Sequence, residues 1–262
     1  MSNVSRLDDS LGLEVQPEDG YFDLMADVAA THWWYRARRH RMAEELRGRL
    51  ARGARAIDVG TGTAESFGTL QNLGATTIVG TDLSMVALRH ARRRSPAPPV
   101  LSCLADPLPF SDSCADVLIC TEVIEHLDDD VGAMREFARV LKPYEPCFIT
   151  TSSYMFLWSE HDVRAAHRRR YRLGELRSAV EGAGFVVDRL CYYYSFLVPL
   201  AILSRKTPLG RFSSETDEET SSMHPLLDKT FYAMAWVETW LTMHKVPIPF
   251  GLSILCVAHT ES

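Results

Sequence analysis

The chain has 262 residues, of which 46% are hydrophobic and 24% charged, as expected for a globular domain that buries a sizeable core. Its formal net charge of −6 excludes a broadly basic surface, so we expect no nucleic-acid partner. The six cysteines form no CxxC pair, and the longest apolar run, 191–204, is shorter than the roughly 20 residues that span a bilayer. With a polar N-terminus that lacks a signal-peptide pattern, these features predict a cytoplasmic protein without a transmembrane segment.

Helix and strand patterns alternate along most of the chain. We expect a flexible segment at 1–19, a helical cap at 20–50 and one domain over 51–262. Strands are predicted at 54–59, 76–81, 99–104, 116–120, 146–151, 185–191 and 252–258. Helices are predicted at 64–73, 84–94, 122–141 with a break near Asp128, and 173–182. Repeated strand–helix units predict a mainly parallel sheet with helices on both faces.

An insertion at 195–248 interrupts this alternation before the last strand. It contains an apolar run, an acidic stretch at 213–222 and a very apolar helix predicted from Leu226 to His244. We expect this helix to pack on the domain as a buried extra layer. If it were exposed, its apolar surface would require a partner, either a second copy of the chain in a homodimer or a membrane surface.

The turn after the first strand, Asp58-Val59-Gly60-Thr61-Gly62-Thr63-Ala64, is the most informative motif. Glycines between a strand and a helix let a ligand approach bare backbone, because they lack Cβ. The dinucleotide fingerprint G-x-G-x-x-G fails, since Glu65 stands where its third glycine belongs, and no P-loop Gly-Lys-Ser/Thr follows. An NAD enzyme is therefore disfavoured, and an acid two residues before the first glycine remains as the distinguishing feature.

Acidic residues follow the next strands. Asp82 ends the second strand, where a carboxylate can accept both ribose hydroxyls, because Ser84 is available to cap the next helix. Asp106 follows the third strand, where it can accept an adenine amino group. Thr121 and Glu122 follow the fourth strand.

With its motifs in this order, the chain resembles the class I S-adenosylmethionine-dependent methyltransferases over about residues 20–195. The family's first motif is D/E-x-G-x-G-x-G, with Ala64 here in place of the third glycine. Residues 137–143 are similar to the family's helix before strand five, although Tyr144 and Glu145 replace the usual glycines. The resemblance implies a Rossmann-like, seven-stranded, mostly parallel sheet of order 3-2-1-4-5-7-6. It also implies S-adenosylmethionine as the cofactor and S-adenosylhomocysteine as its product.

The resemblance also implies cofactor-binding roles. Asp58 is expected to order the turn more than to touch the cofactor. The segment Trp33-Trp34-Tyr35-Arg36-Ala37-Arg38 matches a subgroup whose N-terminal helix lies over the cofactor, so that Tyr35 closes the site and Arg38 meets the methionine carboxylate. The complete set of expected cofactor contacts is Tyr35, Arg38, Asp58, Gly60, Gly62, Asp82, Leu83, Asp106, Thr121 and Glu122.

Two histidines after strand five are the candidate catalytic bases. The segment 159–171 resembles an H-D…H-x-R-R-Y segment that faces the acceptor in a subgroup of these enzymes. In one interpretation, His161 or His167 takes the acceptor's proton and the arginine run binds an anionic acceptor. In the other, the arginines pair with acidic neighbours and hold the loop in place.

Glu122, Glu125 and His126 have the spacing i, i+3, i+4, which would place them on one face of a helix. Quinone-precursor methyltransferases similar to this chain use such an E-x-x-E-H set for magnesium. The alternative is an acidic helix N-terminus without a metal. Since many family members with the same residues bind no metal, we expect none here, with Mg²⁺ as the lesser alternative.

The function implied by the resemblance is methyl transfer to a small-molecule or glycan acceptor, with oxygen as the favoured atom. Two alternatives stay open. One is a lipid-tailed, quinone-precursor-like acceptor that the apolar insertion serves at a membrane surface. The other is a non-catalytic subunit that binds the cofactor.

Overall fold

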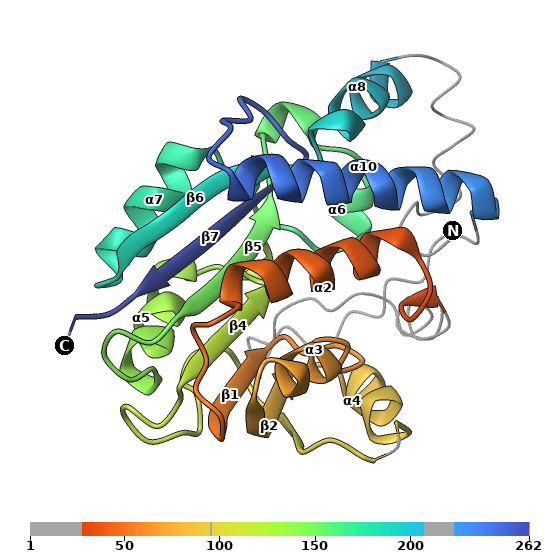
Figure 1. The fold of residues 1–262 in the computed structure, drawn as a ribbon. Coiled ribbons are helices and arrows are strands. Elements are labelled where there is room, and N and C mark those ends of the chain that lie inside the picture. The colour runs from red at the N-terminus through yellow and green to blue at the C-terminus, as the bar shows by residue number, and fades with distance from the viewer. Residues whose placement is uncertain (1–27, 95, 207–222, 262) are drawn as a thin grey trace.

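The computed structural model describes residues 28–94, 96–206 and 223–261 (Figure 1). The segment 1–19, the start of the predicted cap and the whole acidic stretch of the insertion lie outside the described residues.

A seven-stranded sheet with the order β3-β2-β1-β4-β5-β7-β6 forms the centre of the molecule, which confirms the predicted topology. The strands are β1 (Ala54–Val59), β2 (Ala75–Asp82), β3 (Val100–Ser102), β4 (Val117–Thr121), β5 (Cys147–Ser152), β6 (Val186–Tyr193) and β7 (Ser253–His259). β7 runs antiparallel to both of its neighbours, and the other strand pairs are parallel. The carboxyl ends of β1, β2 and β4 therefore meet at one edge of the sheet.

Helices cover both faces of this sheet. The helices of the described residues are α2 (Trp33–Leu46), α3 (Phe67–Asn72), α4 (Met85–Arg92), α5 (Asp130–Val140), α6 (Glu160–Arg164), α7 (Leu173–Gly182), α8 (Val198–Lys206) and α10 (Pro225–Met243). Along β4, Ile119 packs in the core with α2, α3 and α10, whereas Leu118 packs in the core with α5 and α7. Alternate side chains thus enter opposite layers, as expected for a strand buried on both faces.

The predicted helix at 122–141 is wrong at its start. Glu122 has a left-handed φ of 54°, and only one 3-10 turn, η2 (Ile124–His126), follows it. α5 begins at Asp130 because the Asp129 side chain caps it by accepting from the backbone N–H of Gly132 at 2.8 Å. Glu122, Glu125 and His126 therefore do not share a helix face.

The N-terminal cap helix α2 lies beside α10 across one face of the sheet (Figure 1). Asp228 of α10 accepts from the backbone N–H of Trp33 at 2.6 Å and pairs with Arg36 at 3.1 Å. At the other end, the buried Glu45 pairs with Arg41 at 2.8 Å and with Arg189 of β6 at 3.0 Å. These contacts hold α2 over the sheet.

The side of α10 that faces the domain is more polar than the side that faces outward. Its buried residues are Ala235, Glu238, Thr239 and Thr242. Glu238 accepts from the N–H and hydroxyl of Ser195, which explains how a carboxylate is accommodated there. The outer side, which we name the α10 apolar face, is at least 40% exposed at each of Leu226, Leu227, Met234, Trp236, Val237 and Trp240.

The expectation that the insertion is a buried layer is therefore wrong for the α10 apolar face, because hydrogen bonding has turned the polar side of the helix inward. No helix among the described residues has the length and apolar character needed to span a bilayer. All six cysteines are free thiols.

Candidate active site

The turn between β1 and α3 has the backbone that a glycine motif requires. Gly60, Gly62 and Ala64 have φ values of 68°, 54° and 60°, so that every second residue is left-handed. A Cβ on Gly60 would lie 2.1 Å from Val123 Cγ2, so a larger residue does not fit. Ala64 takes the left-handed conformation of the missing third glycine, at a cost of about 1–2 kcal/mol.

Asp58 holds this turn in place through hydrogen bonds to its side chain. Its carboxylate accepts hydrogen bonds from the hydroxyl of Thr61 at 2.8 Å and from the hydroxyl of Ser66. Burial raises the pKa of Asp58 to about 6, although both hydroxyls act in the opposite direction. The side chain is 2% exposed, so the role expected for it, ordering the turn, agrees with its contacts.

Asp58→Asn is expected to remove a pH-dependent loss of stability. Because burial raises the pKa of Asp58 from 3.8 to about 6, the folded chain binds more protons than the unfolded chain between these values. Wild-type stability therefore falls as the pH rises through this window, by at most about 3 kcal/mol from this residue. Urea unfolding measured from pH 4 to pH 7 should show that the free energy of unfolding of Asp58→Asn increases relative to that of wild type as the pH rises. Parallel pH curves for the two proteins would contradict this assignment.

Asp82 joins the glycine turn to the start of α4. One carboxylate oxygen accepts from the N–H of Gly62 and the other from the N–H of Ser84, each at 2.8 Å. Ser84 is the N-cap of α4, as predicted, and its hydroxyl accepts from the N–H of Ala87 at 3.2 Å. Burial raises the pKa of Asp82 against these backbone donors. Each carboxylate oxygen keeps a second lone pair that can accept a ligand hydroxyl.

Asp106 lies four residues beyond the end of β3 and is exposed. Its carboxylate accepts no hydrogen bond from the part of the chain that the structure describes. The acceptor atoms remain available to a ligand.

Arg38 brings a positive charge to the same edge of the sheet. Its guanidinium lies 5.2 Å from the centre of the Tyr35 ring, and within residues 28–94, 96–206 and 223–261 no hydrogen bond or ion pair holds it. Burial alone would lower the pKa of Arg38, but Glu122, Tyr35 and Glu65 outweigh burial and raise it. The side chain is therefore a stable cation whose hydrogen-bond donors are unused.

Glu122 supplies the opposite charge. Its carboxylate accepts from the hydroxyl of Thr150 at 2.8 Å and from the hydroxyl of Tyr193 at 3.2 Å. Arg38 and Glu122 thus present a cation and an anion together beyond the end of β4, an arrangement that complements a zwitterionic ligand.

The segment after β5 is organised by Asp162. This buried carboxylate accepts from Arg170 Nε at 2.6 Å and contacts His167 Nδ1 at 2.8 Å. Burial would raise the pKa of Asp162, but His167 and Arg170 lower it, so the group is an anion. His161 lies with its ring centre 6.0 Å from that of His167. The Asp162 carboxylate thus fixes the ring of His167, one of the two predicted bases.

The arginine run in this segment pairs with acidic residues of the same chain. Arg169 contacts Asp130 at 2.7 Å and Arg168 contacts Asp128 at 3.2 Å. Since Arg170 is held by Asp162, all three arginines have carboxylate partners. These pairs favour the interpretation in which the arginines hold the loop in place.

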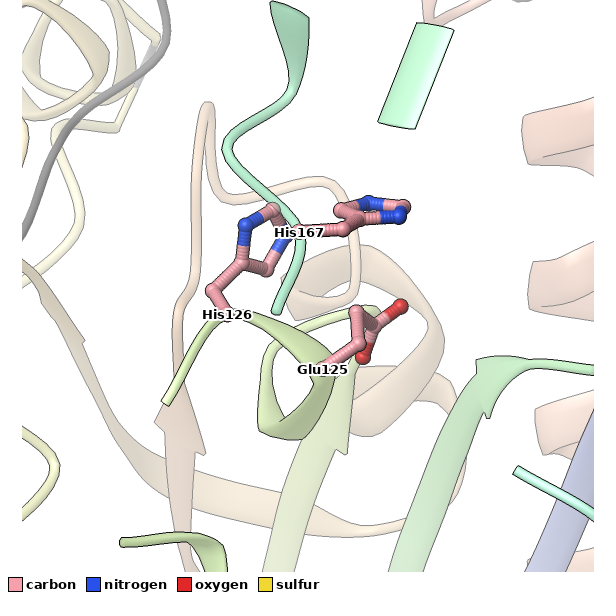
Figure 2. Close-up of side chains that lie close together, drawn as sticks. All are labelled: Glu125, His126 and His167. Atoms are coloured by element: carbon pink, nitrogen blue, oxygen red, sulfur yellow. The ribbon is translucent and has the colours of Figure 1, made fainter. Parts of the chain in front are cut away.

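Glu125 and His126 lie close to His167 (Figure 2). Burial, with the neighbouring Glu122, raises the pKa of Glu125 well above its usual range. Burial, with the neighbouring His167, lowers the pKa of His126 to about 3. At neutral pH, the His126 imidazole is therefore uncharged.

Comparisons with known proteins agree with this architecture. A family model described as a methyltransferase domain matches residues 57–148. A probable S-adenosylmethionine-dependent methyltransferase of Mycobacterium tuberculosis is 31% identical over 169 residues, which cover 63% of this chain and 60% of the relative. Residues 57–148 thus match a methyltransferase domain, and the strand order is the one expected from the resemblance to the class I S-adenosylmethionine-dependent methyltransferases.

The chain is also similar to a demethylmenaquinone methyltransferase of Chlorobaculum tepidum, which is 27% identical over 130 residues, or 50% of this chain and 53% of the relative. The chain thus spans only about half to three-fifths of the length of these relatives. Among solved structures, the chain bound to the Haloferax volcanii Trm112 methyltransferase activator has a TM-score of 0.63 at 20% identity, with 93% of this chain and 96% of that chain covered. At such low identity the likeness shows the fold alone.

The methyltransferase fold brings the residues of the glycine turn, Asp82, Leu83, Thr121 and Glu122 to one edge, because Val59 pairs with both Thr81 and Cys120. The sequence patterns predicted no role for Thr150 and Tyr193, whose hydroxyls hold the Glu122 carboxylate. Tyr193 lies 71 residues from Glu122 in sequence, so no local pattern could have linked the two.

Proposed function

We propose that this chain transfers the methyl group of S-adenosylmethionine to an oxygen atom of a small-molecule or glycan acceptor. The observation that carries the proposal is the charged guanidinium of Arg38, which has no hydrogen bond or ion pair among the described residues and lies beside Glu122, next to the glycine turn. The cofactor ends in an amino acid, whose carboxylate and ammonium would complement these two charges. When bound, its positively charged sulfur makes the attached methyl group electrophilic.

The other residues at this edge fit the rest of the cofactor. The free lone pairs of Asp82 would accept the ribose hydroxyls, and the exposed carboxylate of Asp106 would accept the adenine amino group. Gly60 and Gly62 leave the backbone of the turn open to a ligand. Leu83 and Thr121 adjoin these residues at the ends of β2 and β4.

We assign the role of general base to His167, with His161 as the alternative. Because Asp162 accepts from Nδ1 of His167, the second ring nitrogen, Nε2, is the one that can take a proton from an acceptor hydroxyl. The same carboxylate would stabilise the imidazolium that this proton transfer produces. The acceptor itself can be found by incubating the protein with methyl-labelled S-adenosylmethionine and a cell extract, then identifying what becomes labelled.

His167→Ala should lower turnover on that acceptor by about 100- to 10,000-fold, since a general base contributes an effect of this size. His161→Ala is the matched variant in the same segment and should retain most of the turnover. S-adenosylhomocysteine affinity should be unchanged in both, which separates loss of the base from loss of the cofactor site. Near wild-type turnover in His167→Ala would remove the assignment. If no extract component is labelled although the cofactor binds, the non-catalytic subunit is favoured.

The α10 apolar face supports a second candidate, a lipid-tailed acceptor methylated at a membrane surface. Its exposed Trp236 and Trp240 belong to a residue type that is common at membrane–water interfaces, and one relative carries the name of a demethylmenaquinone methyltransferase. Sedimentation of the protein with lipid vesicles, lost in Trp236→Ser with Trp240→Ser, would favour this candidate. A dimer in solution that the same substitutions dissociate would instead assign the face to a homodimer.

A further inference from the structure

Three side chains with metal-binding atoms converge outside the predicted cofactor contacts. Glu125 and His126 come from η2, and His167 comes from the segment that follows α6 (Figure 2). One ligand atom from each lies within 4.8 Å of the other two. The rings of His126 and His167 meet edge to face, with their centres 4.6 Å apart.

Glu125 contributes an unsatisfied oxygen atom to this cluster. The residue is fully buried, and its Oε2 accepts from the hydroxyl of Thr151 at 2.9 Å. Its Oε1 has no hydrogen-bond partner among the described residues. An unsatisfied buried carboxyl oxygen is costly, so its presence calls for a ligand or a functional explanation.

His167 is already oriented as a metal ligand. Its Nδ1 lies 2.8 Å from Asp162 Oδ1, and the same carboxylate is fixed by Arg170 at 2.6 Å. A carboxylate that holds one ring nitrogen of a ligating histidine sets its tautomer and ring orientation, and leaves the other nitrogen for the metal. Asp162 is therefore placed as the carboxylate that orients the histidine in a histidine–metal site.

We propose that Glu125, His126 and His167 form a binding site for a first-row divalent transition metal such as Zn²⁺. Two imidazoles and one carboxylate suit zinc and its neighbours, whereas Mg²⁺ prefers oxygen ligands. The ligand set differs from Glu122, Glu125 and His126, because Glu122 is held by Thr150 and Tyr193. A metal here would tie the turn after β4 to the segment after β5. Because the metal would take the same Nε2 of His167 that is assigned as the general base, a chain that holds the metal would use His161, the alternative base.

The test is a Zn²⁺ titration of the full, metal-stripped chain by calorimetry, without cofactor or acceptor. Wild type should bind one Zn²⁺ per chain, and a hundredfold excess of Mg²⁺ should not displace it. Glu125→Gln and His167→Gln should each weaken Zn²⁺ binding by more than about 100-fold, and Asp162→Asn by about 10- to 100-fold. His244→Ala, at an exposed histidine at the end of α10, should bind like wild type.

Added Zn²⁺ should also raise the thermal unfolding midpoint of wild type and of His244→Ala, but not that of Glu125→Gln, because a ligand that binds only the folded chain stabilises it. Midpoints measured without metal report whether each variant folds. Absence of one-site Zn²⁺ binding in wild type, or equal affinity in wild type and in a folded Glu125→Gln or His167→Gln variant, would overturn the proposal. Since no cofactor is present, that failure would leave the proposed methyl transfer untouched.

Discussion

Arg38→Ala is expected to weaken S-adenosylhomocysteine binding by about 30- to 1,000-fold, because removing one member of a buried charge pair typically costs about 2–4 kcal/mol. The guanidinium has no hydrogen bond within the described residues, so the donors that it would give to the ligand carboxylate are not replaced by a neighbour. Arg38→Lys should recover only part of the affinity, because an ammonium lacks the planar fork that matches a carboxylate. Calorimetry or fluorescence titration would measure these affinities.

Binding of 5′-methylthioadenosine tests whether Arg38 contacts the amino-acid end of the ligand, since that compound has the adenosine and the sulfur but no amino acid. Its affinity should be the same for wild type and Arg38→Ala. Arg47→Ala, at the C-cap of the same helix, is the control, because the Arg47 side chain is 67% exposed and pairs with Glu44. Equal losses for both ligands, or no loss for either, would show that Arg38 does not bind the carboxylate.

Asp82→Asn should weaken binding of both ligands by about 100-fold. The amide keeps the shape of the side chain but replaces one acceptor oxygen with a donor, so it cannot serve Gly62, Ser84 and two ribose hydroxyls together. The loss of a charged acceptor facing several donors is of the order of 3 kcal/mol. Titration of S-adenosylhomocysteine and 5′-methylthioadenosine into the same variant would measure it.

Asp128→Asn is the matched control for Asp82→Asn, because the Asp128 side chain is 72% exposed and pairs with Arg168 at the surface. It should bind both ligands like wild type. A loss confined to S-adenosylhomocysteine in Asp82→Asn would move this residue from the ribose to the amino-acid end of the ligand. Arg38→Ala thus tests binding of the amino-acid end of the ligand, and Asp82→Asn tests binding of its ribose.

The sheet could be predicted because its signals are local. β1 and α7 have the predicted bounds, since a buried apolar run defines the first and the Gly182–Gly184 stop ends the second. The order of all seven strands followed from the family resemblance carried by Asp58, Gly60 and Asp82.

The errors come from interactions between residues that are distant in sequence, or from competing local conformations. The helix expected at Glu122 does not form, because this residue is left-handed and Asp129 caps a later start. The outward turn of the α10 apolar face depends on Glu238 bonding Ser195, 43 residues away. His167 lies close to Glu125 and His126 in space but is distant from them in sequence. The spacing of Glu125 and His126 could therefore not predict this contact.

A calorimetric titration of S-adenosylhomocysteine into wild type and Asp82→Asn tests the central claim, a cofactor site at the carboxyl ends of β1, β2 and β4, most directly. We predict saturable binding of one ligand per wild-type chain, no binding of NAD⁺ under the same conditions, and about 100-fold weaker S-adenosylhomocysteine binding in Asp82→Asn. Absence of binding to the folded wild-type chain, or equal affinity in the two proteins, would contradict the site.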